Sequence, residues 1–155
     1  MKSLLVVISI HHNNTLKIAN VIAKVLDAQI EMPQQINPEK LQEYNLIGFG
    51  SGIYGEKHHK SLLDLADELT PVNSKKAFLF STAGITSKNK VTNDHSTLKE
   101  KLKIKGYTID DEFQCKGYNT NSFLRYIGGM NKGRPNSEDL RHAEEFAQKM
   151  KRNET

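Results

Sequence analysis

The chain has 155 residues, 37% of them hydrophobic and 26% charged, so it is long enough to bury a core and too apolar for a disordered segment. Its 22 Lys and Arg exceed its 18 acids by a net charge of only +4, spread without a block of like charge, which argues against a nucleic-acid-binding protein. The single cysteine, Cys115, excludes an intrachain disulfide, and no run approaches the roughly 18 apolar residues of a membrane-spanning helix. We therefore expect one cytoplasmic domain, residues 1–155, that contacts neither membranes nor nucleic acid.

The N-terminal region has the pattern of a buried strand, a polar loop and an amphipathic helix. An apolar run within Lys2–Ile10 leads into the loop Ser9–Thr15, and apolar residues then recur at helical spacing from Ile18 to Leu26. Such a loop directs helix N-terminal amides, and the positive end of the helix dipole, beyond the strand. We interpret it as an anion site for a phosphate group. The alternative is a helix start that only carries capping residues, and this loop alone does not decide between the two.

The rest of the chain alternates apolar runs with helical patterns. The predicted strands lie within Ala28–Met32, Leu46–Gly50, Lys76–Phe80 and Tyr107–Cys115. The predicted helices are a short turn from Pro38 to about Glu43, Lys57–Leu69, a helix from Asn93 or Asp94 to Ile104, and a last helix that begins at Ser137. This alternation predicts βαβ units and a parallel sheet covered on both faces.

In such a sheet, ligands bind beyond the carboxyl ends of the strands. The connections at this edge carry small, hydroxyl or glycine residues: Ser9–Thr15, Gly50–His59, Ser81–Ser87 and Cys115–Asn136. Gly50–Gly55 matches G-x-G-x-x-G, but the acid expected about 20 residues later is missing, which argues against a dinucleotide site. These glycines instead suit close approach of the backbone to a flat ligand. We expect neither a metal site nor a catalytic side chain.

Together these segments resemble the flavodoxin family over nearly the whole chain. Ser9–Thr15 stands where the family has its phosphate loop, while Gly50–Gly55 and Ser81–Gly84 are similar to the loops that contact the flavin ring. Gly133–Asn136 is similar to the segment before the last helix of small flavodoxin-like proteins. The resemblance implies an α/β fold, a flavodoxin-like three-layer sandwich with a five-stranded parallel sheet in the order 2-1-3-4-5. It also implies that FMN binds at the point where the strand order reverses.

The resemblance also implies the residues of the site. The FMN phosphate would be held by Ser9, His11, His12, Asn13, Asn14 and Thr15. The flavin ring would be flanked by Ser51, Gly52, Ile53, Tyr54, Gly55, Ser81, Thr82, Ala83 and Gly84, with Tyr54 as the stacking residue. Asn13 departs from the family because it replaces the usual loop glycine, although Asn tolerates a positive φ better than most residues.

The implied function is electron transfer between redox proteins by a monomer or weak dimer. Because flavodoxins are typically acidic and this chain is basic, our hypothesis is an acidic redox partner. The alternative is an FMN-dependent oxidoreductase of the same fold, a quinone reductase or a protoporphyrinogen oxidase-like protein, with Tyr118, Phe123 and Arg125 lining a substrate pocket. A third class is a flavodoxin-like binding module that does not bind FMN.

Overall fold

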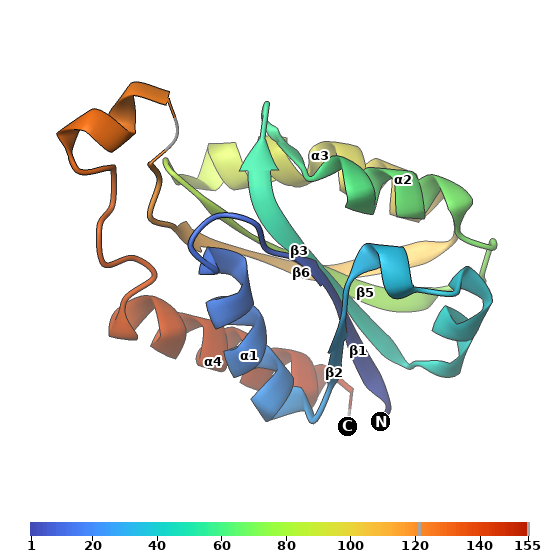
Figure 1. The fold of residues 1–155 in the computed structure, drawn as a ribbon. Helices are drawn as coiled ribbons and strands as arrows, with labels where there is room; N and C mark the ends of the chain where they lie inside the picture. Colours follow the sequence, from blue (N-terminus) through green and yellow to red (C-terminus); the bar gives the residue numbers. More distant parts are fainter. Residues whose placement is uncertain (121, 155) are drawn as a thin grey trace.

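The computed structural model describes residues 1–120 and 122–154, and it shows a parallel sheet between two layers of helices (Figure 1). The strands are β1 (Ser3–Ile8), β2 (Gln29–Glu31), β3 (Leu46–Tyr54), β5 (Lys75–Ala83) and β6 (Tyr107–Lys116). They lie in the order β2-β1-β3-β5-β6, and every neighbouring pair is parallel. The short β4 (Lys57–His58) pairs only with β3, in the antiparallel sense. The predicted five-stranded order 2-1-3-4-5 is confirmed, with β5 and β6 as its fourth and fifth strands.

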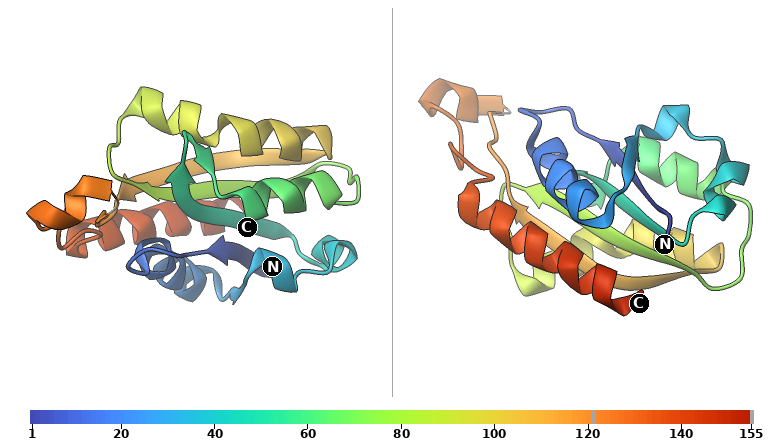
Figure 2. Two further views of the ribbon diagram at one scale, coloured as in Figure 1. Left: turned by 45° about the horizontal axis from the view of Figure 1, so that its top comes forward. Right: turned by 90° about the horizontal axis from the view of Figure 1, so that it is seen from below.

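Two helices cover each face of the sheet (Figures 1 and 2). On one face lie α1 (Asn14–Leu26) and α4 (Ser137–Asn153), and on the other lie α2 (Lys60–Glu68) and α3 (Lys88–Ile104). Short 3₁₀ helices span Pro33–Gln35, Pro38–Glu43 and Ser122–Ile127, the last being η3. No helix among the described residues is long and apolar enough to cross a membrane.

Successive residues of a strand point alternately into two separate hydrophobic cores, one on each face of the sheet. This explains why the strands are apolar throughout. On β5, Phe78 and Phe80 pack with Ile22 of α1 and Phe146 of α4 in the first core. Leu79 of the same strand packs in the second core, which includes residues of α2 and α3. The two cores therefore hold the carboxyl ends of the central strands rigidly in place.

Two predicted strand ends are wrong. β3 continues to Tyr54, so residues 50–54 form strand rather than loop, and the chain reverses over Gly55 and Glu56. These two residues have φ of 55° and 63°, as a two-residue hairpin turn requires. β5 likewise continues to Ala83, so residues 81–83 are strand. Pairing with neighbouring strands, which the local sequence does not show, extends both.

Two predicted helix starts are also wrong, and in each case a capping side chain explains the observed start. α2 begins at Lys60 rather than Lys57, because Nδ1 of His59 accepts the N–H of Ser61 at 3.0 Å. α3 begins at Lys88 rather than near Asn93, because Oγ of Ser87 accepts the N–H of Lys90 at 3.1 Å.

Two glycines of β3 make room for aromatic rings of β5. A Cβ atom built on Gly48 would overlap the ring of Phe78, and one on Gly50 would overlap the ring of Phe80. Gly50 is therefore required by the core, not by a ligand. Close approach to a ligand stays a prediction for Gly52, where the nearest atoms to an added Cβ belong to the Tyr54 side chain, with its hydroxyl at 3.2 Å.

A buried polar network holds the β3–β4 hairpin from the α3 side. Nε2 of His58 donates to the Phe80 carbonyl at 3.1 Å, and the His58 ring centre lies 4.6 Å from that of His95 on α3. Nδ1 of His95 donates to the Glu112 carboxylate at 3.2 Å, which leaves its Nε2 to accept the Ser81 hydroxyl at 2.7 Å. Both imidazoles are almost fully buried, so the hairpin that carries Tyr54 is tied to β5, β6 and α3.

Replacing Gly50 with Ala should lower the free energy of unfolding by about 1–3 kcal/mol, because the added methyl must displace the Phe80 ring within a packed core. Urea unfolding of the two proteins measures the difference. The matched control is Gly52→Ala, whose methyl has more room. An equal loss in both variants would show that the fit of Phe80 against Gly50 is not what the core requires.

Stability should decrease in acid because His58 must be neutral in the folded state. Burial, and secondarily the neighbouring His95, lowers the pKa of His58 from 6.5 to about 3. Its stabilising contribution is therefore complete above pH 6.5 and is lost as the pH falls toward 3, by up to about 1.4 kcal/mol per pH unit. Urea unfolding across this range should give a flatter pH dependence for His58→Gln than for the parent, while the exposed control His142→Gln should follow the parent. A parent-like slope in His58→Gln contradicts this assignment.

Candidate functional site

A pocket of about 60 Å³, open to solvent, lies at the carboxyl edge of the sheet. It is bounded by the loop after β1, the ends of β3 and β5, and the segment after β6. The residues that line it are Ser9, Ile10, His11, Asn14, Thr15, Gly52, Ile53, Tyr54, Thr82, Ala83, Gly84, Gly117, Tyr118 and Asn119. Their segments were the four connections that the sequence indicated, so the structure brings them together as predicted.

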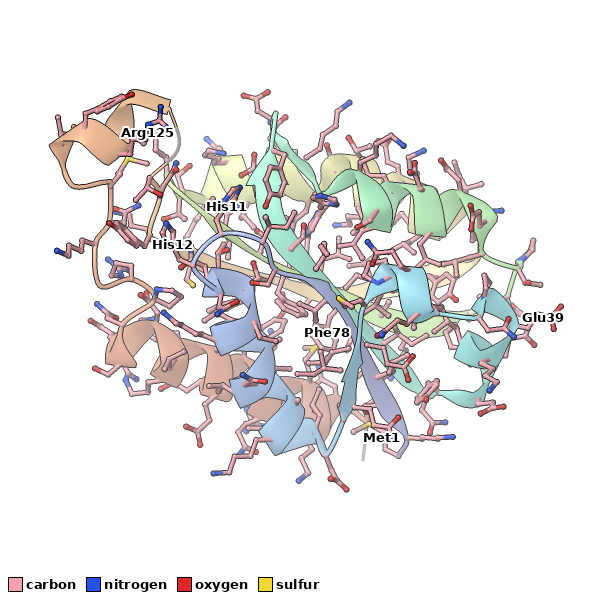
Figure 3. All side chains as sticks on the ribbon, in the orientation of Figure 1. Met1, His11, His12, Glu39, Phe78 and Arg125 are labelled. Carbon is pink, nitrogen blue, oxygen red and sulfur yellow. The ribbon has the colours of Figure 1, made fainter. Side chains whose placement is uncertain are left out.

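The loop after β1 turns sharply onto the N-terminus of α1. His12 and Asn13 both adopt left-handed backbone conformations, with φ of 53° and 54°, and Asn tolerates this conformation better than most residues. Oγ of Ser9 accepts the N–H of Leu16 at 3.1 Å, which leaves the Ser9 hydroxyl hydrogen available to donate. Figure 3 shows His11 and His12 on this loop above the start of α1. The N–H of Asn14 donates to the His11 carbonyl at 3.2 Å, so not every amide at this helix start is open to a ligand. The arrangement still suits an anion, because the positive end of the helix dipole lies at this loop.

Two buried side chains of α1 that line the pocket bond to other segments of its wall. Oγ1 of Thr15 and Oγ1 of Thr82 are hydrogen bonded at 2.9 Å, which links α1 to β5. Nδ2 of Asn14 donates to the Tyr118 carbonyl at 2.8 Å, which links α1 to the segment after β6. Oδ1 of Asn14 is buried and has no hydrogen-bond partner among the residues that the structure describes. A buried acceptor of this kind is normally satisfied, so it indicates a missing donor in the pocket.

Two tyrosines from different segments border the pocket. Tyr54, at the end of β3, contacts the His59 ring edge to face with ring centres 5.2 Å apart, and its partial burial raises its pKa. Tyr118 follows β6, and its ring centre lies 4.3 Å from that of His12. Aromatic side chains at two borders of one pocket suit a flat ligand.

Ten of the fifteen predicted site residues line the pocket: Ser9, His11, Asn14, Thr15, Gly52, Ile53, Tyr54, Thr82, Ala83 and Gly84. His12, Asn13, Ser51, Gly55 and Ser81 do not line it. The two serines lie within strands and are fully buried. Oγ of Ser51 accepts the N–H of His59 at 2.9 Å, and Ser81 belongs to the His95 network, so both stabilise the hairpin.

The three remaining residues contact other parts of the loops. Gly55 forms the hairpin turn, and Asn13 precedes α1 with its side chain exposed and without a capping hydrogen bond. Nε2 of His12 is hydrogen bonded to Oγ1 of Thr120 at 2.8 Å, so His12 braces the segment after β6.

Four lining residues, Ile10, Gly117, Tyr118 and Asn119, were not among the fifteen predicted site residues. Gly117 packs so closely on α1 that a Cβ atom there would lie 2.7 Å from Nδ2 of Asn14. The signal that could have found the last three is their position directly after β6, at the edge where the other loops meet. Of the residues proposed for a substrate pocket, Tyr118 lines this one, Arg125 lies exposed on η3, and the side chain of Phe123 is outside the described part of the chain.

Comparisons with known proteins agree with the fold. The flavodoxin domain family matches residues 5–124. A protein of Methanocaldococcus jannaschii described as uncharacterized is 46% identical over 153 residues, which cover 99% of this chain and 100% of that protein. Among solved structures, oxidised flavodoxin 2 from Bacillus cereus has a TM-score of 0.73 at 19% identity, covering 99% of each chain. A flavodoxin from the domain Archaea has a TM-score of 0.65 at 18% identity, covering 97% of this chain and 99% of that one.

The two structural matches have low sequence identity and show the fold alone. The family match spans most of the chain, including the loop after β1, the β3–β4 hairpin and the end of β5. The chain therefore belongs to the flavodoxin domain family.

Proposed function

We propose that the pocket binds FMN and that the protein carries electrons between redox proteins. The observation that carries this proposal is a single pocket that combines an anion-binding helix start with two bordering tyrosines. A phosphate needs the first feature and a flat ring system the second. Membership of the flavodoxin domain family supports the same ligand.

The available polar atoms of the pocket match the parts of FMN. The free hydrogen of the Ser9 hydroxyl would donate to the phosphate, together with those N–H groups at the start of α1 that are not already engaged, since Asn14 donates to the His11 carbonyl and Leu16 to Ser9. Oδ1 of Asn14 can only accept, so it would receive a hydrogen bond from a ribityl hydroxyl rather than contact the phosphate. Tyr54 and Tyr118 would border the ring. Bound FMN would supply the one- and two-electron redox chemistry.

The cysteine does not offer an alternative redox centre. Burial raises the pKa of the Cys115 thiol to about 12, so the thiol stays protonated at neutral pH and reacts poorly. Its side chain packs in the core with residues of α1 and α4. The pocket therefore supports cofactor-based rather than thiol-based electron transfer.

The second candidate is an FMN-dependent oxidoreductase with a small-molecule substrate. Tyr118 and Asn119 favour it, because they bring the long connection after β6 to the pocket, where a substrate could be held. The electron-carrier proposal is better supported, since Arg125 lies exposed on η3 and does not line the pocket, although it was expected to line a substrate pocket.

Replacing Ser9 with Ala should weaken FMN binding by about 10- to 100-fold, because it removes a donor to a charged phosphate and a partner of the Leu16 amide. Quenching of FMN fluorescence on titration with FMN-free protein measures the affinity. Ser96→Ala, which removes a hydroxyl from α3 away from the pocket, should bind like the parent. Equal affinity in all three proteins contradicts the proposed phosphate site, and no binding by the parent would favour a module that does not bind FMN.

The FMN-loaded protein should not catalyse oxidation of NADH or NADPH by quinones at enzymatic rates, since an electron carrier acts on protein partners. Absorbance of the nicotinamide, followed with and without a soluble quinone, measures turnover, and free FMN at the same concentration gives the background. Sustained turnover well above that background, lost in Tyr118→Ala, would establish the oxidoreductase instead.

A further inference from the structure

Charge is divided unevenly between the surroundings of the pocket and the rest of the chain. We define the pocket rim as the segments that lead from the ends of β1, β3, β5 and β6 to the third residue of the next major helix. These segments are 9–16, 55–62, 84–90 and 117–139. The rim holds seven Lys or Arg and three Asp or Glu, a net charge of +4, while the other 109 residues hold fifteen of each. The whole net charge of the protein therefore lies around the pocket.

Four of the rim cations make no ion pair with any residue that the structure describes. Lys60, Lys90 and Arg134 bind Asp64, Asp94 and Asp139. The unpaired cations, all exposed, are Lys57, Lys88, Arg125 and Lys132. Of the rim acids, Asp139 is bound by Arg134 and Glu138 lies 3.8 Å from Arg141, which leaves Glu56. The charge available to a partner is therefore strongly positive.

Exposed apolar side chains gather at the same rim. Of the seven large hydrophobic residues exposed in the described chain, four belong to it: Ile10, Ile85, Tyr126 and Ile127, which are 51%, 64%, 76% and 69% exposed. Ile10 lines the pocket, and Ile85 follows Gly84, which also lines it. Exposed apolar residues on the same segments as unpaired charges are typical of a protein–protein interface rather than of an ordinary solvated surface.

The helix η3 forms a knob that projects beside the pocket, away from the sheet and its helices (Figures 1 and 2). The backbones of Asn119 and Met130 exchange two hydrogen bonds, of 2.8 and 2.7 Å, at its base. Nδ2 of Asn131 donates to the Gly84 carbonyl at 2.7 Å, which fixes the base to the loop after β5. The knob is therefore held in a defined position relative to the pocket.

The exposed end of the knob carries residue types that dominate binding energy in interfaces. The guanidinium of Arg125 lies 4.9 Å from the centre of the Tyr126 ring, and it donates to the Tyr126 hydroxyl at 2.9 Å. Figure 3 shows Arg125 on this outlying helix. Tyr and Arg are enriched among interface hot spots, and prior ordering of their side chains reduces the entropy lost on binding.

We propose that the pocket rim and the η3 knob dock an acidic redox protein, one that presents carboxylates around an apolar patch near its own redox centre. The docking proposal rests on the proposed function, because electron exchange is the reason for a partner to cover this pocket. The unpaired cations would attract the partner, and the exposed isoleucines with Tyr126 would form the desolvated centre of the contact. A nucleic acid fits less well, since its phosphates offer no surface for these apolar side chains.

The test titrates ¹⁵N-labelled, FMN-loaded protein with a small acidic two-iron ferredoxin and follows the amide NMR signals. At about 20 mM salt, signals of the rim and the knob should shift or broaden in a saturable way. The affinity should fall at least about tenfold at roughly 300 mM salt, because the attraction is then screened. Basic cytochrome c, titrated in the same way, should not saturate these signals.

Charge-reversal variants locate the contact. Arg125→Glu combined with Lys132→Glu should weaken ferredoxin binding about tenfold or more at low salt. Lys24→Glu combined with Lys40→Glu changes the net charge equally at exposed positions outside the rim, and it should keep the affinity within about twofold. The proposal is overturned if both pairs weaken binding equally, if the ferredoxin does not bind or shifts signals elsewhere, or if cytochrome c or a 20-base-pair DNA duplex binds the rim more tightly.

The same titration without FMN separates the two proposals. If the protein fails to bind FMN, the proposed cofactor is refuted. If ferredoxin still docks at the rim of that FMN-free protein in a salt-dependent way, the docking surface stands. Tight FMN binding without any docking would refute the surface alone.

Discussion

The pocket depends on the two side chains that fasten the start of α1 to the far strands. The Thr15–Thr82 hydroxyl pair and the bond from Asn14 to the Tyr118 carbonyl connect the loop after β1 to β5 and to the segment after β6. Both residues of α1 are buried, so these hydrogen bonds do not compete with water. They hold the N-terminus of α1 against the residues that face it, in addition to the packing of the helix in the core.

The opposite side of the pocket is held by different chemistry. The hairpin that carries Tyr54 is tied down by buried imidazoles and serines: His58 donates to the Phe80 carbonyl, Ser51 accepts the N–H of His59, and His95 is hydrogen bonded to Ser81. Glu112 completes this network, and its hydrogen bond from His95 is the main cause that lowers its pKa. The Thr15–Thr82 hydroxyl pair on the α1 side and the histidines on the α3 side thus fix two borders of the pocket. The third border, after β6, is braced by His12 and leads into the exposed knob.

The net positive charge of the protein is concentrated at one edge of the sheet, around the pocket. A net charge of +4 appears unremarkable in a chain of 155 residues, and as a bulk property it implies little beyond solubility. Its concentration at the pocket rim follows from the fold, because segments distant in sequence meet at one edge of a parallel sheet. A protein with a low net charge can therefore still carry one strongly positive surface region.

The amino-acid sequence by itself determined the strand–helix alternation, the parallel sheet and the four connections that form the site, because hydrophobic periodicity is a local property. Asn13 could also be interpreted locally, since Asn tolerates a positive φ better than most residues. Tertiary structure decided where the strands end, because strand pairing sets those ends. Ser51 and Ser81 were predicted to face the ligand, yet in the extended strands they are buried and bonded to the hairpin and to α3. It likewise decided that Gly50 accommodates Phe80, that Tyr118 reaches the pocket, and which cations remain unpaired, since each depends on residues far away in the chain.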